Sequence, residues 1–194
     1  MDHDDALKVS LPGLGPDVYK FLAEKRHLFL TGDVNHSSAN HIVSHLLLLD
    51  FQSNEDITII INSGGGDIEG GLLTIYDAFQ YIKSPIKTFC IGEASSAAGF
   101  LLSAGTIGKR LAFPHAKIML HGVQVSDLSG TQEEISRENK SVRDLNKTLC
   151  EILAKHTGQS IKKITKELKK DKYFTAEEAL KYGIIDKIVT SLKE

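Results

Sequence analysis

ITIIINSGGGDIEGGLLTIYDAF, residues 57–79, contains the structural unit from which most of this chain is built. The run ITIII at 57–61 is typical of a buried strand, because it is continuously apolar and β-branched. Three glycines follow it, and apolar residues then recur at the three- and four-residue spacing of an amphipathic helix: Ile68, Leu72, Ile75, Tyr76 and Phe79. The stretch therefore predicts a strand, a glycine loop and a helix in succession.

The same alternation extends to both sides of this stretch. HLFLT at 27–31 and KTFCI at 87–91 predict two further buried strands, and Ile42, Val43, Leu46 and Leu47 predict a helix between the first two. A β-α-β-α-β series predicts an α/β fold with parallel strands and right-handed crossovers. After Gly105 the pattern changes to short strands, RLAF and AKIML, followed by VQVSDLSG.

Composition predicts one soluble domain spanning residues 1–194. The chain is 41% apolar and 25% charged, and its 23 basic and 25 acidic side chains give a formal charge of −2. This balance argues against nucleic-acid or anionic-membrane binding. No apolar stretch approaches the roughly 18 residues that span a bilayer, and the start MDHDDALK lacks a secretory signal, so we expect a cytoplasmic protein. Cys90 and Cys150 lie in apolar settings without CxxC spacing, which predicts reduced core thiols.

One predicted helix, from about Thr131 to about His156, is unusually long. Thr131 and Glu134 form a capping-box signature at its start. At 1.5 Å per residue the helix would span roughly 38 Å, so we expect it to project from the domain. Its apolar positions form a narrow seam that a second subunit would cover, or that lies across the protein's own core: Ile135, Val142, Leu145, Leu149 and Ile152.

A second capping box begins a short helix near the end of the chain. Thr175 and Glu178 supply its signature, and Gly183 is available as its terminator.

The glycine cluster Gly64-Gly65-Gly66 can present main-chain N–H groups to a phosphate or to a developing oxyanion. No Lys-Ser/Thr follows it as in a P-loop, and it lacks GxGxxG spacing, so the oxyanion hypothesis is favoured over phosphate binding. A plain tight turn is the alternative.

Candidate groups for nucleophilic catalysis are widely spaced. Ser96, in GEASSAAGF, falls between a predicted strand and an apolar helix, His121 ends KIMLH, and Asp171 lies in KKDKYF. A serine becomes a good nucleophile when an imidazole takes its proton and a carboxylate orients that imidazole. The segment does not match GxSxG, however, so small residues packing a helix on a sheet are an alternative for this segment. Nothing local marks His121 or Asp171 as catalytic.

The only other cluster of interest is His41 and His45, one helical turn apart in HIVSH. A metal site needs further ligands, and the sequence offers no nearby glutamate or obvious third ligand. We therefore predict no metal site.

Taken together, these segments resemble the ClpP family, the proteolytic subunit of the ATP-dependent Clp protease, within the crotonase-like superfamily. The resemblance covers nearly the whole chain and rests on these stretches in order: KRHLFLTGDVNHSSANHIVSHLLLLD, INSGGGD, LTIYDAFQYIK, GEASSAAGFLLSAGTIGKR, KIMLH, KHTGQS and KDKYFTAEEALKYGIID.

The resemblance implies a serine endopeptidase of the crotonase-like ClpP fold. Ser96 would be the nucleophile, His121 the general acid and base, and Asp171 the orienting carboxylate. The backbone N–H groups of Gly66 and Ala97 would form the oxyanion hole.

It also implies repeated β-α units with a projecting handle, a strand plus the long helix, over about residues 122–156. Residues 1–24 would form an N-terminal axial segment. A substrate strand would lie between two edges, one of Gly65, Gly66, Asp67 and Ile68, and the other of Val123, Gln124 and Val125.

The implied partners are further copies of the chain in two stacked heptameric rings, a Clp-type AAA+ unfoldase, and unfolded polypeptide substrates. No cofactor is implied, because the chain has no phosphate-binding motif and ATP would be used by the separate ATPase.

Four positions depart from the usual pattern of the family. Gly64 stands where proline is usual, Ala97 where methionine is common, and Gly122-Val123 where Gln-Pro is usual. These changes predict a looser glycine loop and a less constrained handle strand.

Two other functions remain as alternatives. One is a catalytically weak structural or regulatory ring subunit. The other is a crotonase-type acyl-CoA enzyme that uses Glu69 or Glu93 for proton transfer.

Overall fold

A computed structural model describes residues 15–125 and 129–191. Its strands are β1 His27–Val34, β2 Ile57–Gly66, β3 Ile86–Ser95, β4 Arg110–Ala112, β5 Lys117–Leu120, β6 Lys172–Thr175 and β7 Lys187–Ile188. Its helices are α1 Pro16–Glu24, α2 His36–Gln52, α3 Thr74–Tyr81, α4 Ala97–Ser103, α5 Gln132–Thr157, α6 Ile161–Glu167 and α7 Ala176–Tyr182, with a π-helical segment η1 Ile68–Leu73 before α3.

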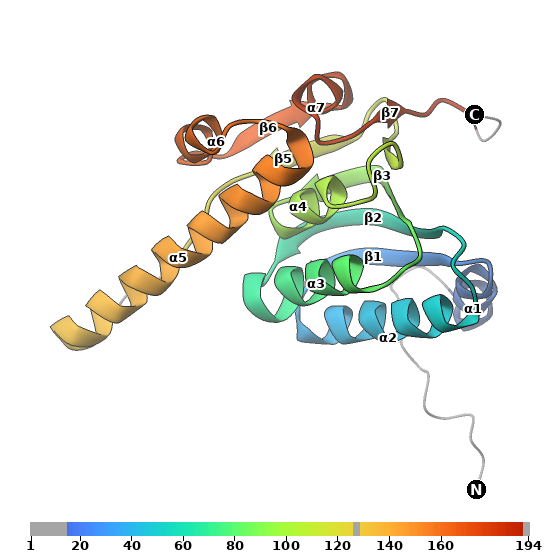
Figure 1. Ribbon diagram of the computed structural model, residues 1–194, viewed down its shortest axis with the longest axis horizontal. Helices are drawn as coiled ribbons and strands as arrows, with labels where there is room; N and C mark the ends of the chain where they lie inside the picture. The colour runs from blue at the N-terminus through green and yellow to red at the C-terminus, as the bar shows by residue number, and fades with distance from the viewer. Residues whose placement is uncertain (1–14, 126–128, 192–194) are drawn as a thin grey trace, which may run out of the picture.

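The strands form one mostly parallel sheet. Its main order is β1-β2-β3-β4-β7, and β5 pairs with β3 and with β6. All of the pairings are parallel except that of β5 with β6. The three buried strands expected from the sequence are β1, β2 and β3, so the predicted α/β class is confirmed (Figure 1).

The core lies between the sheet and its helices. Ile57, Ile59 and Ile61 are fully buried along β2, as the continuous apolar run predicts. On α2, Leu46 is fully buried, but Leu47 is 45% exposed and faces away from the core. The apolar pattern of that helix is therefore wider than the face that its own domain covers.

Helix α5 projects from the body of the protein (Figure 1). Thr131 and Glu134 make the predicted capping box, and Gly158 ends the helix in the left-handed conformation. Its C-terminal half is anchored, with Leu149 and Ile152 buried, whereas Ile135 and Val142 near its N-terminal end are only half-buried. The second predicted capping box, Thr175 with Glu178, also forms, and Gly183 ends α7.

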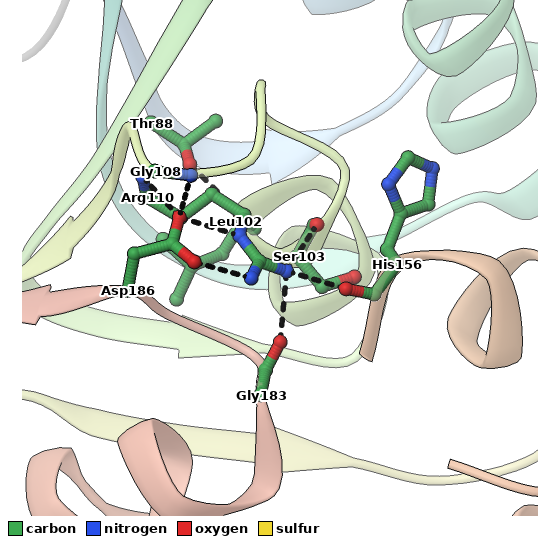
Figure 2. Close-up of polar contacts among 8 residues, drawn as sticks. All are labelled: Thr88, Leu102, Ser103, Gly108, Arg110, His156, Gly183 and Asp186. Atoms are coloured by element: carbon green, nitrogen blue, oxygen red, sulfur yellow. Dashed lines mark hydrogen bonds and ion pairs between the residues drawn. The ribbon is translucent and has the colours of Figure 1, made fainter. Parts of the chain in front are cut away.

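The anchored end of α5 is held by a buried guanidinium. Arg110 Nη1 donates hydrogen bonds to the carbonyl oxygens of Ser103, His156 and Gly183, which belong to the C-terminal ends of α4, α5 and α7. Its Nη2 pairs with Asp186 at 2.6 Å (Figure 2). Burial alone would raise the pKa of Asp186, but hydrogen bonds from Arg110 lower it overall. One cation therefore joins three helix ends, where the helix dipoles concentrate negative charge.

The expected handle strand is not found in the described part of its segment. Residues 121–125 do not form a strand, and residues 126–128 lie outside the described residues. A strand needs a neighbouring strand for its backbone hydrogen bonds, and within the described ranges none pairs with 121–125.

The predicted N-terminal segment is represented by α1. Residues 1–14 of that segment lie outside the described part of the chain.

Among the described helices, none combines the length and hydropathy required to cross a bilayer.

Candidate active site

The three candidate catalytic residues lie at one edge of the sheet. Ser95, the last residue of β3, pairs with Met119 of the parallel strand β5, and Leu120 of β5 pairs with Lys172 of the antiparallel strand β6. The strand ends therefore bring Ser96, His121 and Asp171 to one corner, although 25 and 50 residues separate them in sequence.

Ser96 occupies a strained turn between β3 and α4. Its φ of 54° and ψ of −125° are rarely adopted by a residue with a side chain. The turn is held by a hydrogen bond of 2.8 Å from the Ser96 N–H to the carbonyl oxygen of Met119, and Gly99 N–H donates to the Ser96 carbonyl oxygen. A sharp strand-to-helix turn of this kind exposes the nucleophile in other hydrolases, although the local sequence differs from their motif.

The glycine loop packs directly on this turn. A Cβ at Gly65 would lie 2.7 Å from the Ser96 Cβ and 3.0 Å from the Ala97 nitrogen, and Gly65 has a φ of 97°. Gly66 is equally restricted, because a Cβ there would lie 2.2 Å from the Val34 carbonyl oxygen. Glycine at these two positions permits the close approach that an oxyanion hole between Gly66 and Ala97 would need.

By contrast, Gly64 has open space around its Cβ position and no positive φ. The structure therefore does not require glycine at the position where the family pattern usually has proline.

His121 follows Leu120 and Asp171 precedes Lys172, which are the last paired residues of β5 and β6, but His121 and Asp171 have different hydrogen-bond partners. The His121 Nδ1–H donates to the Gly122 carbonyl oxygen at 2.5 Å. Asp171 Oδ1 accepts a long hydrogen bond of 3.4 Å from Gln124 Nε2. Within the described ranges, no hydrogen bond links His121 to Asp171 or to Ser96. The fold thus gathers the three residues without joining them by hydrogen bonds.

Part of the predicted substrate-binding edges is already used by the protein. The Asp67 N–H donates to the Val34 carbonyl oxygen at 2.7 Å, and the Asp67 carboxylate caps η1 by accepting from Gly70 and Gly71. The Val123 N–H donates to Asn146 Oδ1 at 2.8 Å. Asp67 and Val123 therefore cannot offer these N–H groups to a substrate strand in this arrangement. The Gly65 N–H is also used, because it donates to Ser63 Oγ at 3.1 Å. Gly66, Ile68, Gln124 and Val125 remain predictions on the same edges.

A cavity of about 550 Å³ adjoins His121 and Asp171 on the side of α5 and α6. Ser96 is not among its lining residues. Its wall includes Gly122, Val123 and Asn146.

Asn146 is the residue of this region that sequence reasoning did not identify. No motif marks it, because its importance arises from contact with residues 23 and 24 positions earlier, which no local pattern encodes.

The glutamates of the acyl-CoA alternative lie on different elements. Glu93 is on β3, and its Oε1 accepts a hydrogen bond of 2.6 Å from Ser95 Oγ. Glu69 is exposed in η1. Glu93 is thus held by the residue next to Ser96.

The His41 and His45 pair helps to hold α1 on α2. The Tyr19 hydroxyl is hydrogen-bonded to His41 Nε2, and His45 Nδ1–H donates to the His41 carbonyl oxygen at 2.9 Å. Burial raises the pKa of Tyr19 to about 12, and burial followed by the charge of His45 lowers that of His41. In the described part of the chain, no group of three or more His, Cys, Asp or Glu side chains is placed to hold a metal ion.

Both cysteines are buried and free. Burial raises the pKa of Cys90 to about 11, which keeps it a protonated thiol.

A family model described as Clp protease matches residues 14–192, which is almost the whole chain.

Proposed function

This chain belongs to the Clp protease family, and from that membership we propose that it is a serine endopeptidase that uses Ser96 as its nucleophile. The observation that carries the proposal is the strained turn at Ser96, against which the Gly65-Gly66 backbone packs, at the same sheet edge as His121 and Asp171. Such strain persists only where surrounding structure maintains it, and it is concentrated at functional sites.

In the proposed mechanism, Ser96 Oγ attacks the scissile carbonyl while His121 Nε2 accepts the hydroxyl proton. Nε2 is the basic nitrogen because Nδ1 carries a proton donated to the Gly122 carbonyl. The N–H groups of Gly66 and Ala97 would stabilise the oxyanion, and loss of one such donor in other hydrolases costs about 3–4 kcal/mol. The C–N bond then breaks as His121 returns the proton to the leaving amine, and Asp171 stabilises the imidazolium by its negative charge. Water, deprotonated by His121, hydrolyses the acyl-enzyme and restores the Ser96 hydroxyl.

The proposal extends to assembly in stacked heptameric rings and to a separate Clp-type ATPase that delivers unfolded polypeptides. The projecting α5, with apolar residues half-covered near its free end, supports contact with a second subunit. The chain has no phosphate-binding motif, which supports assigning ATP hydrolysis to the partner.

A second candidate is a catalytically weak ring subunit. It is favoured by one observation, the pairing of Asp171 with Gln124 and of His121 with Gly122 instead of with each other.

Labelling by a fluorophosphonate probe tests the proposal. The purified protein and its Ser96→Ala variant are compared, and the assembly state is recorded on the same samples. Labelling that requires Ser96 is expected. An assembled ring without labelling would favour the weak subunit, and an unlabelled small oligomer would favour the acyl-CoA alternative.

A further inference from the structure

Asn146, in the middle of α5, connects the long helix to the backbone that follows His121. Its Oδ1 accepts the Val123 N–H at 2.8 Å, and its Nδ2 donates to the Val142 carbonyl oxygen one turn earlier on α5 at 2.9 Å. Because the second bond fixes the orientation of the carboxamide, the oxygen is directed at residue 123 and the nitrogen at the helix.

Gly122 is held from a second direction. Its N–H donates to the Leu168 carbonyl oxygen at 2.9 Å. A Cβ at position 122 would lie 2.7 Å from Asn146 Oδ1 and 3.1 Å from the Leu168 carbonyl oxygen. The Gly122 backbone therefore lies between α5 and the turn after α6, and both of these contact it.

The peptide unit between Gly122 and Val123 links Asn146 to His121 through two hydrogen bonds. Its N–H is bound by Asn146, and its carbonyl oxygen accepts the His121 Nδ1–H at 2.5 Å. Since a peptide unit is planar, fixing the N–H also fixes the direction of the carbonyl. The carbonyl in turn determines which imidazole nitrogen carries the proton.

We propose that Asn146 is a positioning residue for His121: it holds the 122–123 peptide so that the Gly122 carbonyl keeps the imidazole in the tautomer with a basic Nε2. This inference rests on the proposed role of His121 as general base. It also explains how this chain constrains the handle without proline at position 123, because valine retains the N–H that Asn146 binds and proline would lack it.

The chain offers a matched control on the same helix. Asn139 is half-buried like Asn146, and its Nδ2 donates to the Ile135 carbonyl oxygen at 2.9 Å. It thus makes the same bond to the preceding turn, but in the described part of the chain it forms no hydrogen bond with residues 121–123. Substituting Asn139 reproduces the loss of that bond without disturbing the His121 backbone.

The experiment measures the rate of fluorophosphonate labelling and the kcat and KM for a fluorogenic peptide. The wild type is compared with Asn146→Leu, which removes both polar atoms at similar size, with Asn146→Asp, which retains an oxygen acceptor, and with Asn139→Leu. Thermal unfolding of each variant reports any general loss of structure.

Asn146→Leu is expected to slow labelling and lower kcat by about tenfold, with little change in KM, because an N–H loses its acceptor and the imidazole its fixed tautomer. Asn146→Asp is expected to recover most of the rate above the titration of its carboxyl group, and Asn139→Leu to retain the wild-type rate.

Equal rates for Asn146→Leu and Asn139→Leu would overturn the inference while leaving Ser96-dependent labelling intact. If Asn146→Leu does not fold, a folded Asn146→Asp variant that labels at less than a tenth of the wild-type rate would overturn it as well. Absence of Ser96-dependent labelling in the wild type would instead overturn the proposed function, and the inference with it.

Discussion

Gly65 lies against Ser96 so closely that a methyl group on Gly65 would lie 2.7 Å from the Ser96 Cβ and 2.5 Å from the carbonyl oxygen of Ser95. The glycine loop and the candidate nucleophile therefore form one packed unit. Any side chain at position 65 must displace backbone, since its neighbours there are not the flexible ends of side chains.

Gly65→Ala is expected to lower the free energy of unfolding by more than about 1 kcal/mol, because it adds this clash to a positive φ, and to slow labelling of Ser96 at least about tenfold. Gly64→Ala is the matched control in the same loop. With open space and no positive φ, it should leave labelling unchanged and raise stability by about 0.4–1 kcal/mol. Denaturant unfolding and probe labelling check both, and similar effects of the two substitutions would contradict the packing argument.

Asp171→Asn is expected to slow peptide cleavage more than about tenfold, because the imidazolium loses a stabilising charge. The loss should nevertheless fall well short of the roughly 10⁴-fold seen when the orienting aspartate of a trypsin-like protease is replaced, because the Gly122 carbonyl already holds the His121 tautomer. The measurement is kcat for a fluorogenic peptide, with the exposed Asp144→Asn on α5 as the control. A full 10⁴-fold loss would show that Asp171 alone fixes the tautomer of His121.

Arg110→Met is expected to lower the free energy of unfolding by about 3–5 kcal/mol, since it leaves Asp186 without its buried partner and three helix ends without a donor. The neighbouring Lys109→Gln breaks an ion pair with Asp56 whose side chains are 37% and 43% exposed, and it should cost at most about 1 kcal/mol. Urea unfolding of the two variants compares them directly. Comparable losses would show that Arg110 does not hold the end of α5.

Stability is expected to fall as the pH is lowered from about 6.5 towards 4. Burial, and then the charges of Lys155 and Arg110, lower the pKa of His156 from 6.5 to about 4. The unfolded chain therefore binds a proton in this range that the folded chain does not, and unfolding is favoured as protons are added.

Replacing His156 by Gln should flatten the stability of the protein across that pH range. Protonation of Asp186 affects stability only at lower pH, because its pKa lies below the ordinary 3.8. Thermal unfolding at several pH values is the measurement. If the stability of the variant depends on pH as steeply as that of the wild type, another group causes the dependence.

Much of the fold follows from local patterns. Ile57, Ile59 and Ile61 are buried because a continuous β-branched run suits a central strand, and Thr131 and Glu134 form a capping box because both groups lie within one helical turn. The sequence predicts a handle strand, but residues 121–125 do not form one, because strand formation depends on a partner that the local sequence does not specify.

For the candidate site, too, the sequence determines the identity of the residues and the tertiary structure determines their arrangement. The sequence is sufficient to name Ser96, His121, Asp171 and the glycine loop, because these segments resemble those of one family. Their arrangement depends on strand order: β5 beside β3 and β6 beside β5 bring the residues to one corner. The strained φ of Ser96, the Gly122 carbonyl on His121 and the contact of Asn146 with Val123 arise from segments distant in sequence. Such contacts are settled by packing in three dimensions, because no periodicity or local propensity specifies which backbone groups meet across 23 residues of chain.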